Sequence, residues 1–271
     1  AAALPLGTVR RIRNDLQFWD HIISAEDGHQ IDRLNVRTDV AGTGHSQYSG
    51  TVKLNTTLSG GHYLMKDGSR GVNGKFGGLA ITNANNDYIP TGTLYSDADN
   101  QWGDGQQYVS GASTTGANGQ TAAVNALWGL ASTYDTMKNV MGWHSLDGND
   151  TATYATVHYG QGYTNANYDE ACRCIRVGDG NGVDYKNLGV IDVLGHEMGH
   201  GVTARTSKLP MYGEAGGLNE SGADINGEMA EAYARNGAGG KAVPAGNDWM
   251  IAKEAWYQGQ ALRYLRKPSK D

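Results

Sequence analysis

Residues 190–206 read VIDVLGHEMGHGVTART, and apolar side chains recur in this stretch at every fourth position. These positions are Val190, Leu194, Met198 and Val202. The spacing predicts a helix over Leu188–Thr206. In such a helix the imidazoles of His196 and His200 lie one turn apart on the same face, so both can bind one tetrahedral Zn2+. Glu197 is rotated away from that face and can instead take a proton from water at the metal.

A second motif offers a third ligand. The segment GGLNESGAD, residues 216–224, places Glu220 about twenty positions after His200. We predict a second helix over Glu214–Arg235, and a glutamate on a second helix can complete a His2Glu site whose fourth position stays open. The alternative is a pair of surface histidines and a solvent-facing glutamate. With only 8 histidines in 271 residues, an accidental HExxH spacing is improbable.

Acidic residues cluster around these two predicted helices. Asp192 lies one turn before His196, Glu228 and Glu231 follow Glu220 on the second helix, and Asp248 comes after a glycine-rich loop. Four hard oxygen donors at one point would suit Ca2+ better than a second zinc ion. Ordinary surface carboxylates are the alternative.

The rest of the sequence indicates an α+β protein. Glycine makes up 40 of the 271 residues, roughly twice the usual share, which excludes a helical bundle. From about Val40 to Gln120, short β-favouring stretches alternate with Gly, Asn and Asp clusters, and the first long helical pattern covers Ala122–Val140. Further strands are expected at Ala155–Tyr159 and Cys172–Val177, and an isolated one at Leu16–Ile22.

Charge and hydropathy argue against two classes of partner. The net charge of -6 gives no electrostatic reason to expect nucleic acid binding. No apolar run approaches the roughly 18 residues of a membrane helix, so no membrane partner is expected. The two cysteines, Cys172 and Cys174, lie two positions apart on a predicted strand, where bridging geometry is poor. We therefore expect two buried or loosely paired thiols, with metal binding as the alternative.

The ordered motifs resemble the thermolysin-like neutral metalloproteases, family M4, especially the vibriolysin, pseudolysin and actinomycete branches. Besides the two zinc motifs, the matching stretches are YDTMKNVMGWHSLDGND, VHYGQGYTNANYDEACRCIRVGDGNG, NDWMIAKEA and ALRYLRKPSKD, which together span most of residues 122–271. The resemblance implies a gluzincin fold in which a β-rich N-terminal lobe precedes the zinc-site helices. It divides the chain into a propeptide tail at 1–40, the β-rich lobe at 41–186 and a helical zinc-site region at 187–271.

The resemblance assigns roles by position. It implies that His196, His200 and Glu220 bind zinc, that Glu197 is the general base, and that two further side chains orient the imidazoles. Those two are Asn219 and Asp224. Residues implied to contact substrate are Asn165, Ala166 and Arg263. The implied calcium ligands are Asp192, Glu228, Glu231, Asp248 and the Met250 carbonyl.

Several positions depart from the family pattern. Met211 replaces a tyrosine that hydrogen-bonds the oxyanion, and Asn167 replaces an aromatic residue on the substrate edge. Gly222 and Asn226 replace apolar residues on the second helix, and Lys253 replaces an acidic ligand of a second calcium ion. The segment that carries the family's second catalytic histidine has no match, so we expect the C-terminal helical lobe to be missing. The C-x-C pair also occurs in actinomycete-type relatives, which implies a structural role or a clamp on a loop.

Together with this resemblance, the sequence predicts a secreted zinc endopeptidase that contains Zn2+ and Ca2+. The resemblance implies that it cleaves before bulky apolar residues. Its expected partners are polypeptide substrates and its own propeptide, and the complete protein is expected to be a monomer. One alternative is a truncated or degenerate homologue that binds metal and peptide without cleavage. Another is a zinc aminopeptidase, which the NExxxD motif and the calcium-type residues disfavour.

Overall fold

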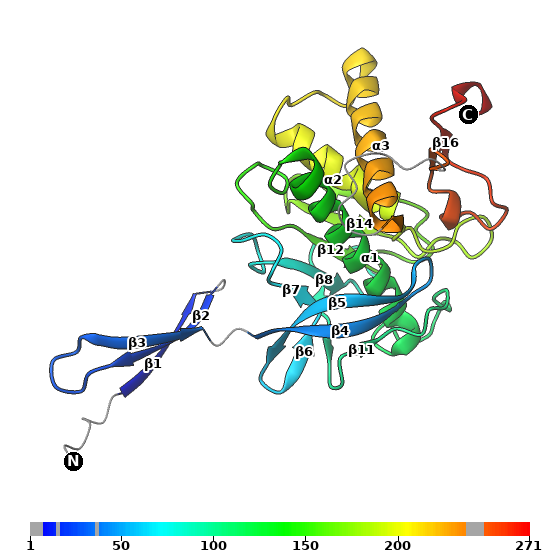
Figure 1. Ribbon diagram of the computed structural model, residues 1–271. Helices are drawn as coiled ribbons and strands as arrows, with labels where there is room; N and C mark the ends of the chain where they lie inside the picture. The colour runs from blue at the N-terminus through cyan, green and yellow to red at the C-terminus, as the bar shows by residue number, and fades with distance from the viewer. Residues whose placement is uncertain (1–7, 15–16, 36–37, 237–246) are drawn as a thin grey trace.

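A computed structural model of the chain describes residues 8–14, 17–35, 38–236 and 247–271. At the N-terminal end, three antiparallel strands form a small sheet in the order β1-β2-β3. The strands are β1 (Thr8–Asn14), β2 (Gln17–Ile23) and β3 (Gln30–Asn35). This sheet stands apart from the rest of the molecule (Figure 1). The predicted strand at Leu16–Ile22 corresponds to β2, except for Leu16, which lies outside the described residues.

A five-stranded sheet, ordered β10-β6-β5-β4-β11, begins the main body. Its strands are β4 (Thr38–Ser46), β5 (Gly50–Ser59), β6 (His62–Leu64), β10 (Ser96–Asp97) and β11 (Gln101–Trp102). β4 and β5 pair antiparallel from Thr38↔Leu58 to Ser46↔Gly50. β4 thus runs through the proposed propeptide boundary at residues 40 and 41.

A second sheet carries the edge that faces the candidate site. Its order is β13-β14-β12-β8-β7, with β9 paired to β8. The strands are β7 (Lys66–Asp67), β8 (Leu79–Asn83), β9 (Thr93–Leu94), β12 (Tyr154–Val157), β13 (Ala166–Asp169) and β14 (Cys174–Val177). β12 pairs parallel with β8 and β14 and is buried along its length, as a central parallel strand should be. β13 pairs antiparallel with β14 only and therefore forms one edge.

Three long helices complete the main body, and short elements follow them. The helices are α1 (Ala117–Thr136), α2 (Ile191–Arg205) and α3 (Gly213–Arg235). The short elements are a π-helical turn (Met137–Met141), β15 (Met250–Ile251), a 3-10 turn (Lys253–Ala255), β16 (Arg263–Tyr264) and a 3-10 turn (Pro268–Lys270). The predicted helix at Ala122–Val140 is thus α1 with its π-helical turn, and it begins five residues earlier, at Ala117. These elements confirm the α+β class.

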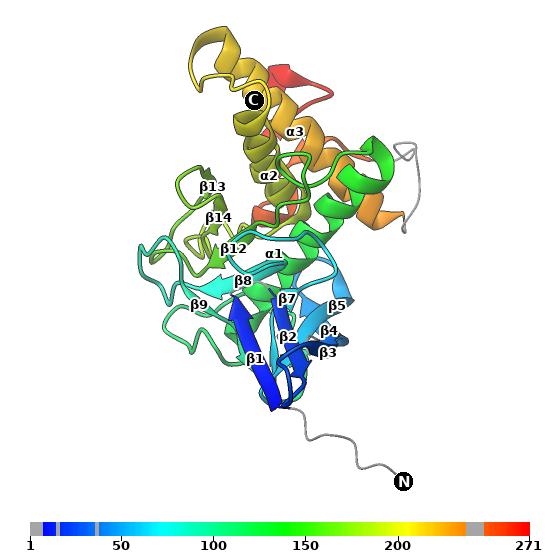
Figure 2. The same cartoon turned by 90° about the vertical axis from the view of Figure 1, so that its left-hand side faces the viewer.

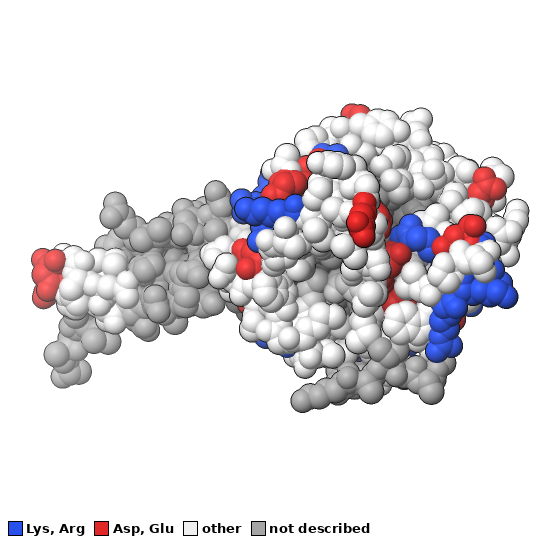
Figure 3. Space-filling view, turned by 90° about the horizontal axis from the view of Figure 1, so that it is seen from above, with Lys and Arg blue, Asp and Glu red and all other residues white. Residues whose placement is uncertain are grey.

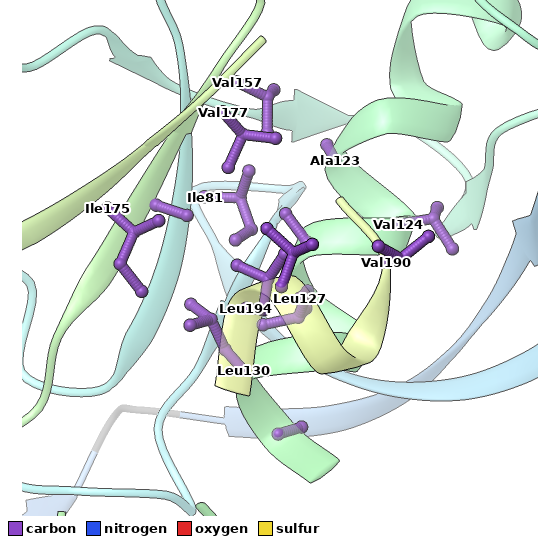
Figure 4. Packing of buried hydrophobic residues seen from close by; sticks show 14 of the residues in the cluster. Ile81, Ala123, Val124, Leu127, Leu130, Val157, Ile175, Val177, Val190 and Leu194 are labelled. Carbon is purple, nitrogen blue, oxygen red and sulfur yellow. The ribbon is translucent and has the colours of Figure 1, made fainter. Parts of the chain in front are cut away.

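The main core lies between α1, α2 and the second sheet. Figure 4 shows Leu127 and Leu130 of α1 meeting Leu194 of α2, with Ile81 and Ile175 on the sheet side. All five side chains are buried. The apolar residues that predicted α2 therefore form the face of this helix that packs in the core. This packing fixes the rotation of the helix about its axis and hence the directions of its two histidines.

Glycines let α2 and α3 approach closely. A Cβ atom on Gly195 would lie 2.7 Å from the Cα atom of Gly227, and one on Gly199 would lie 2.8 Å from the Cα atom of Ala223. Real Cβ atoms do not approach other carbons so closely, so larger residues would force the helices apart. The short separation brings residues on α3 within reach of the two histidines on α2. Figure 2 shows the ribbons of α2 and α3 lying together.

The expectation that the two cysteines lack bridging geometry is wrong. Cys172 and Cys174 form a disulfide with their Cα atoms 5.2 Å apart, within the usual range for a bridge. The prediction treated both residues as part of one strand, whereas β14 begins at Cys174 and Arg173 adopts a left-handed conformation with φ +53°. This turn rotates the two side chains toward each other.

On the face shown in Figure 3, acidic and basic side chains are interspersed among larger uncharged areas. Within the described part of the chain, no helix is both long and apolar enough to cross a membrane.

Candidate metal centre and cleft

Two imidazoles on α2 face each other one turn apart. The Nε2 atoms of His196 and His200 are 2.9 Å apart. On the opposite side of each ring, His196 Nδ1 lies 2.7 Å from Asp224 Oδ1 and His200 Nδ1 lies 2.9 Å from Asn219 Oδ1. Because these oxygens accept hydrogen bonds, each Nδ1 carries the proton and each Nε2 presents a lone pair to the space between the rings.

Glu220 on α3 reaches the same space. Its Oε2 lies 3.4 Å from His196 Nε2, and its Oε1 lies 3.7 Å from His200 Nε2. The three potential ligand atoms lie within 4.8 Å of one another. Two lone pairs and a carboxylate without a shared proton repel one another, so this arrangement fits a cation at its centre. The donor set of two imidazoles and one carboxylate is typical of catalytic zinc.

Glu197 is buried beside these residues, and its carboxylate is held by the backbone. The N–H of Tyr168, on edge strand β13, donates to Glu197 Oε2 over 2.6 Å. Burial raises the pKa of Glu197, and this effect exceeds the opposing attraction of the His196 and His200 rings. A carboxylate with a raised pKa accepts a proton more readily, as a general base must.

Buried Asp224 connects His196 to Arg263, which is half-buried. Arg263 donates to both oxygens of Asp224, from Nε to Oδ2 over 2.6 Å and from a terminal nitrogen to Oδ1 over 2.5 Å. Burial by itself would raise the pKa of Asp224, but the hydrogen bonds from His196 and Arg263 outweigh it and lower the pKa. Asp224 therefore stays ionised and keeps the His196 ring in one tautomer.

A cleft of about 690 Å³ opens beside the three candidate ligands. The predicted substrate contacts Asn165, Ala166 and Arg263 all line it, as do His196, His200, Glu197, Glu220 and Met211. Apolar side chains make up much of the remaining wall, namely Leu188, Val193, Leu209, Ile251 and Leu262. Edge strand β13 runs along the cleft, so an extended peptide could pair with it.

A second acidic cluster lies away from the cleft. Carboxylate oxygens of Asp192, Glu228 and Glu231 lie within 4.8 Å of one another, and all three residues are buried. Burial and then the charge of Glu231 raise the pKa of Glu228 to about 7. Glu228 Oε1 is buried without any hydrogen-bond partner. Such crowding and the unpaired oxygen fit a divalent cation.

The other two predicted calcium ligands are placed differently. Asp248 Oδ2 accepts a hydrogen bond from Lys253 Nζ over 2.7 Å, and Asp248 does not belong to the three-carboxylate group. Met250 lies two residues further on, and its N–H donates to Asp248 Oδ1 over 3.2 Å. Lys253, which was expected to argue against a second ion, therefore neutralises Asp248 directly.

Two contributions to the site were not predicted. Tyr168 acts through its backbone N–H, and no side-chain pattern reports such a donor. Asn226, buried on α3, donates from Nδ2 to the carbonyl oxygen of Gly195 over 2.6 Å and joins α3 to the turn that carries His196. Its polar side chain on the inward face of a helix was the available signal.

Two protein-family models match consecutive parts of the chain. Residues 41–204 match the family model described as thermolysin metallopeptidase, catalytic domain. Residues 207–271 match the model described as thermolysin metallopeptidase, alpha-helical domain. The expectation that the C-terminal helical lobe is missing was therefore wrong, since this part of the chain matches that domain. The absence of one histidine-bearing motif was insufficient evidence against it.

Curated relatives cover most of this chain, which spans less than half of their own length. The transglutaminase-activating metalloprotease of Streptomyces mobaraensis is 41% identical over 232 residues, covering 85% of this chain and 27% of that protein. The bacillolysin of Brevibacillus brevis is 33% identical, covering 93% and 41%. A thermolysin of Alicyclobacillus acidocaldarius subsp. acidocaldarius is 31% identical, covering 93% and 44%.

A solved structure of another metalloproteinase is also similar to this chain. The precursor of protealysin, a metalloproteinase from Serratia proteamaculans, is 28% identical and superposes with a TM-score of 0.53, covering 68% of this chain and 52% of that one. The sequence match over the catalytic domain extends across more than half of the chain. The chain therefore belongs to the thermolysin metallopeptidase family.

Proposed function

We propose that this chain is a zinc endopeptidase in which His196, His200 and Glu220 hold the metal. The observation that carries the proposal is the convergence of two Nε2 lone pairs and a carboxylate, with Glu197 buried next to them. Zinc bound there supplies Lewis acidity, which polarises a peptide carbonyl and makes the attacking water more acidic.

Protein side chains perform the proton transfers. Glu197 takes the proton of the attacking water and then delivers it to the leaving amine. Because the Tyr168 N–H holds Oε2, the other carboxylate oxygen is free to accept that proton. Asp224 and Asn219 keep the two imidazoles in the orientation that ligation requires.

The cleft supports a substrate preference. Asn165 and Ala166 would pair with the substrate backbone, and Arg263 would border the pocket beyond the scissile bond. The apolar side chains in the cleft wall suit a bulky apolar residue directly after that bond.

We also propose that the protein is secreted, that the complete enzyme is a monomer, and that residues 1–40 are the tail of a propeptide.

Replacing Glu197 with Gln tests the mechanism. Glutamine keeps the shape of the side chain but cannot accept the proton, so turnover should fall by at least about 100-fold while zinc remains bound. The measurements are hydrolysis of an internally quenched, N-acetylated peptide and zinc content after gel filtration. Glu214→Gln, an exposed change in the first turn of α3, is the matched control. Full activity of E197Q would reject the mechanism, and cleavage within the blocked peptide would reject an aminopeptidase.

One observation favours a second candidate, a homologue that binds metal and peptide without cleavage. Met211 stands in the cleft wall, where its thioether has no proton to donate to a developing oxyanion. Losing one such donor typically costs about 100- to 1000-fold in rate. Casein hydrolysis measured with and without a zinc chelator separates the two candidates. Chelator-sensitive hydrolysis rejects the non-catalytic one.

We further propose that Asp192, Glu228 and Glu231 hold Ca2+, with Asp248 and the Met250 carbonyl as additional ligands. Hard carboxylate oxygens are the ligands that Ca2+ prefers. The unpaired Glu228 Oε1 is the observation that supports this site. Calcium ligation by Asp248 would require its contact with Lys253 to open.

A further inference from the structure

Met211 combines exposure with a direct contact to a residue that orients a histidine. Its side chain is 59% exposed in the wall of the cleft. Its Sδ atom lies 2.9 Å from Nδ2 of Asn219, which donates to it. Asn219 is buried, and its Oδ1 accepts the hydrogen bond from His200 Nδ1. One side chain thus separates the exposed sulfur from a candidate zinc ligand.

We propose that Met211 is an oxidation site through which peroxides weaken zinc binding. This inference rests on the proposed zinc site. A sulfur lone pair attacks one peroxide oxygen, an S–O bond forms and the O–O bond breaks. Sulfur is oxidised by two electrons, and with hydrogen peroxide the second oxygen leaves as water after proton transfer. The product is methionine sulfoxide, which reductases can convert back.

Oxidation would change the contact with Asn219. A sulfoxide is far more strongly hydrated than a thioether, so it favours the solvent-exposed position that Met211 already borders. As Met211 turns outward, Asn219 Nδ2 keeps only its 2.9 Å hydrogen bond to the Leu209 carbonyl. The Asn219 amide is then less restrained, and so is the His200 ring that depends on it. Removal of such outer partners typically lowers metal affinity by about 10- to 100-fold.

Competing targets for the oxidant are limited among the described residues. Both cysteines are in the disulfide, so no free thiol is present there. Met65, Met137 and Met198 are buried, and Met229 and Met250 are half-buried. Met141 is 47% exposed at the end of the π-helical turn and does not line the cleft. It is therefore a matched control with similar access to peroxide.

The experiment treats zinc-loaded protein with hydrogen peroxide, then measures zinc release to a colorimetric chelator and oxygen addition at each methionine by peptide mass spectrometry. In the wild type and in Met141→Leu, zinc release should accelerate several-fold as the Met211 peptide gains oxygen. In Met211→Leu, peroxide should leave zinc release unchanged relative to the untreated variant. Met211→Gln, which places a polar side chain there without oxidant, should release zinc faster than Met211→Leu.

Repair provides a test that needs no variant. Methionine sulfoxide reductase should restore zinc retention in oxidised wild-type protein. Equal peroxide sensitivity of wild type and Met211→Leu would overturn the inference, and so would full oxidation of Met211 with unchanged zinc retention. If untreated protein neither binds zinc nor cleaves peptide, the proposed function itself fails before any oxidant is added.

Discussion

At the scale of single residues, each candidate histidine ligand depends on one polar neighbour. Asp224 accepts hydrogen bonds from both His196 and Arg263. Its negative charge therefore holds the His196 ring in place and also pairs with the Arg263 guanidinium at the cleft. Asn219 has a similar role for His200, with Leu209 and Met211 as its other contacts. Ligand geometry is thus controlled from α3, although both histidines belong to α2.

Replacing Asp224 with Asn should lower zinc affinity by about 10- to 100-fold, because the amide keeps the shape but removes the charge that supports the imidazole. Competition with a chelator of known affinity measures the change. Asp135→Asn removes a carboxylate that pairs with Arg70 outside the cleft, and it should leave zinc affinity as it is. Equal affinities for wild type and D224N would remove Asp224 from this role.

Tyr168 provides a pH-dependent test. Burial, followed by the hydrogen bond to Glu170, raises the pKa of the Tyr168 hydroxyl to about 12. Since the folded pKa exceeds the ordinary value of 10.0, the contribution to stability is complete below pH 10 and is lost as pH rises toward 12. The melting temperature of the wild type should therefore fall more steeply over this interval than that of Tyr168→Phe. Parallel melting curves would contradict this assignment.

The sequence predicted the parts of the site that follow from periodicity. His196, Glu197 and His200 lie on one helix, so their mutual placement follows from 3.6 residues per turn. Glu220 was proposed from its place on a second predicted helix, whereas the roles of Asn219 and Asp224 required a known family, because the angle between two helices cannot be derived from either one. The Tyr168 amide and the Asp248–Lys253 contact depend on loops and backbone positions, which side-chain patterns do not specify.

At the scale of elements, the contact between α2 and α3 depends on the absence of side chains. Gly195 packs on Gly227, whereas Gly222 faces open space with nothing within 4 Å of a Cβ at that position. Substitution by alanine should therefore change the stability of the protein in opposite directions at these two positions. Gly195 allows the close approach of the helices, whereas Gly222 only lowers helix stability.

Gly195→Ala should destabilise the protein by about 1–3 kcal/mol, since the added methyl group would lie 2.7 Å from the Gly227 Cα atom. Gly222→Ala should stabilise it by about 0.5–1 kcal/mol, because alanine restricts the unfolded chain and meets no atom. Thermal unfolding of both variants with metal saturated gives the comparison. Stabilisation by both substitutions would exclude tight packing at Gly195.

Helices and strands were predicted correctly where the pattern of apolar residues was long, whereas their first and last residues were predicted less well. The helices at Leu188–Thr206 and Glu214–Arg235 correspond to α2 and α3 within three residues at each end. α1 extends further than predicted because Gly119, Gln120 and Thr121 are buried although they are not apolar. β1 and β3 were not predicted, since their short sequences have no clear alternation.

At the scale of the whole molecule, the acidic cluster joins distant parts of the chain. Asp192 lies on α2, and its Oδ2 accepts the Ala252 N–H over 2.6 Å, while Glu228 and Glu231 lie on α3. Asn247 donates to Glu228 over 2.9 Å. A cation at this cluster would hold both helices and the segment after residue 246 together, so its loss should affect global stability more than the chemistry of the cleft.

Removing calcium should lower the melting temperature of the wild type by several degrees, because the buried carboxylates then repel one another. Glu228→Gln removes one of these charges, so it should raise the melting temperature of calcium-free protein and abolish most of the gain on adding calcium. Glu214→Gln is the control and should behave as the wild type does. Calcium titrations followed by thermal unfolding test this, and an unchanged calcium response in E228Q would disprove the site.

The bridge between Cys172 and Cys174 closes a ring of only three residues. In polymer terms, so short a ring removes few conformations from the unfolded chain, with an expected gain below about 2 kcal/mol, against about 3 kcal/mol for a 15-residue ring. The disulfide therefore acts mainly on the local conformation of the chain between β13 and β14. The bridge restricts the turn that connects β13 to β14, and through that turn it limits how far the edge strand along the cleft can separate from β14.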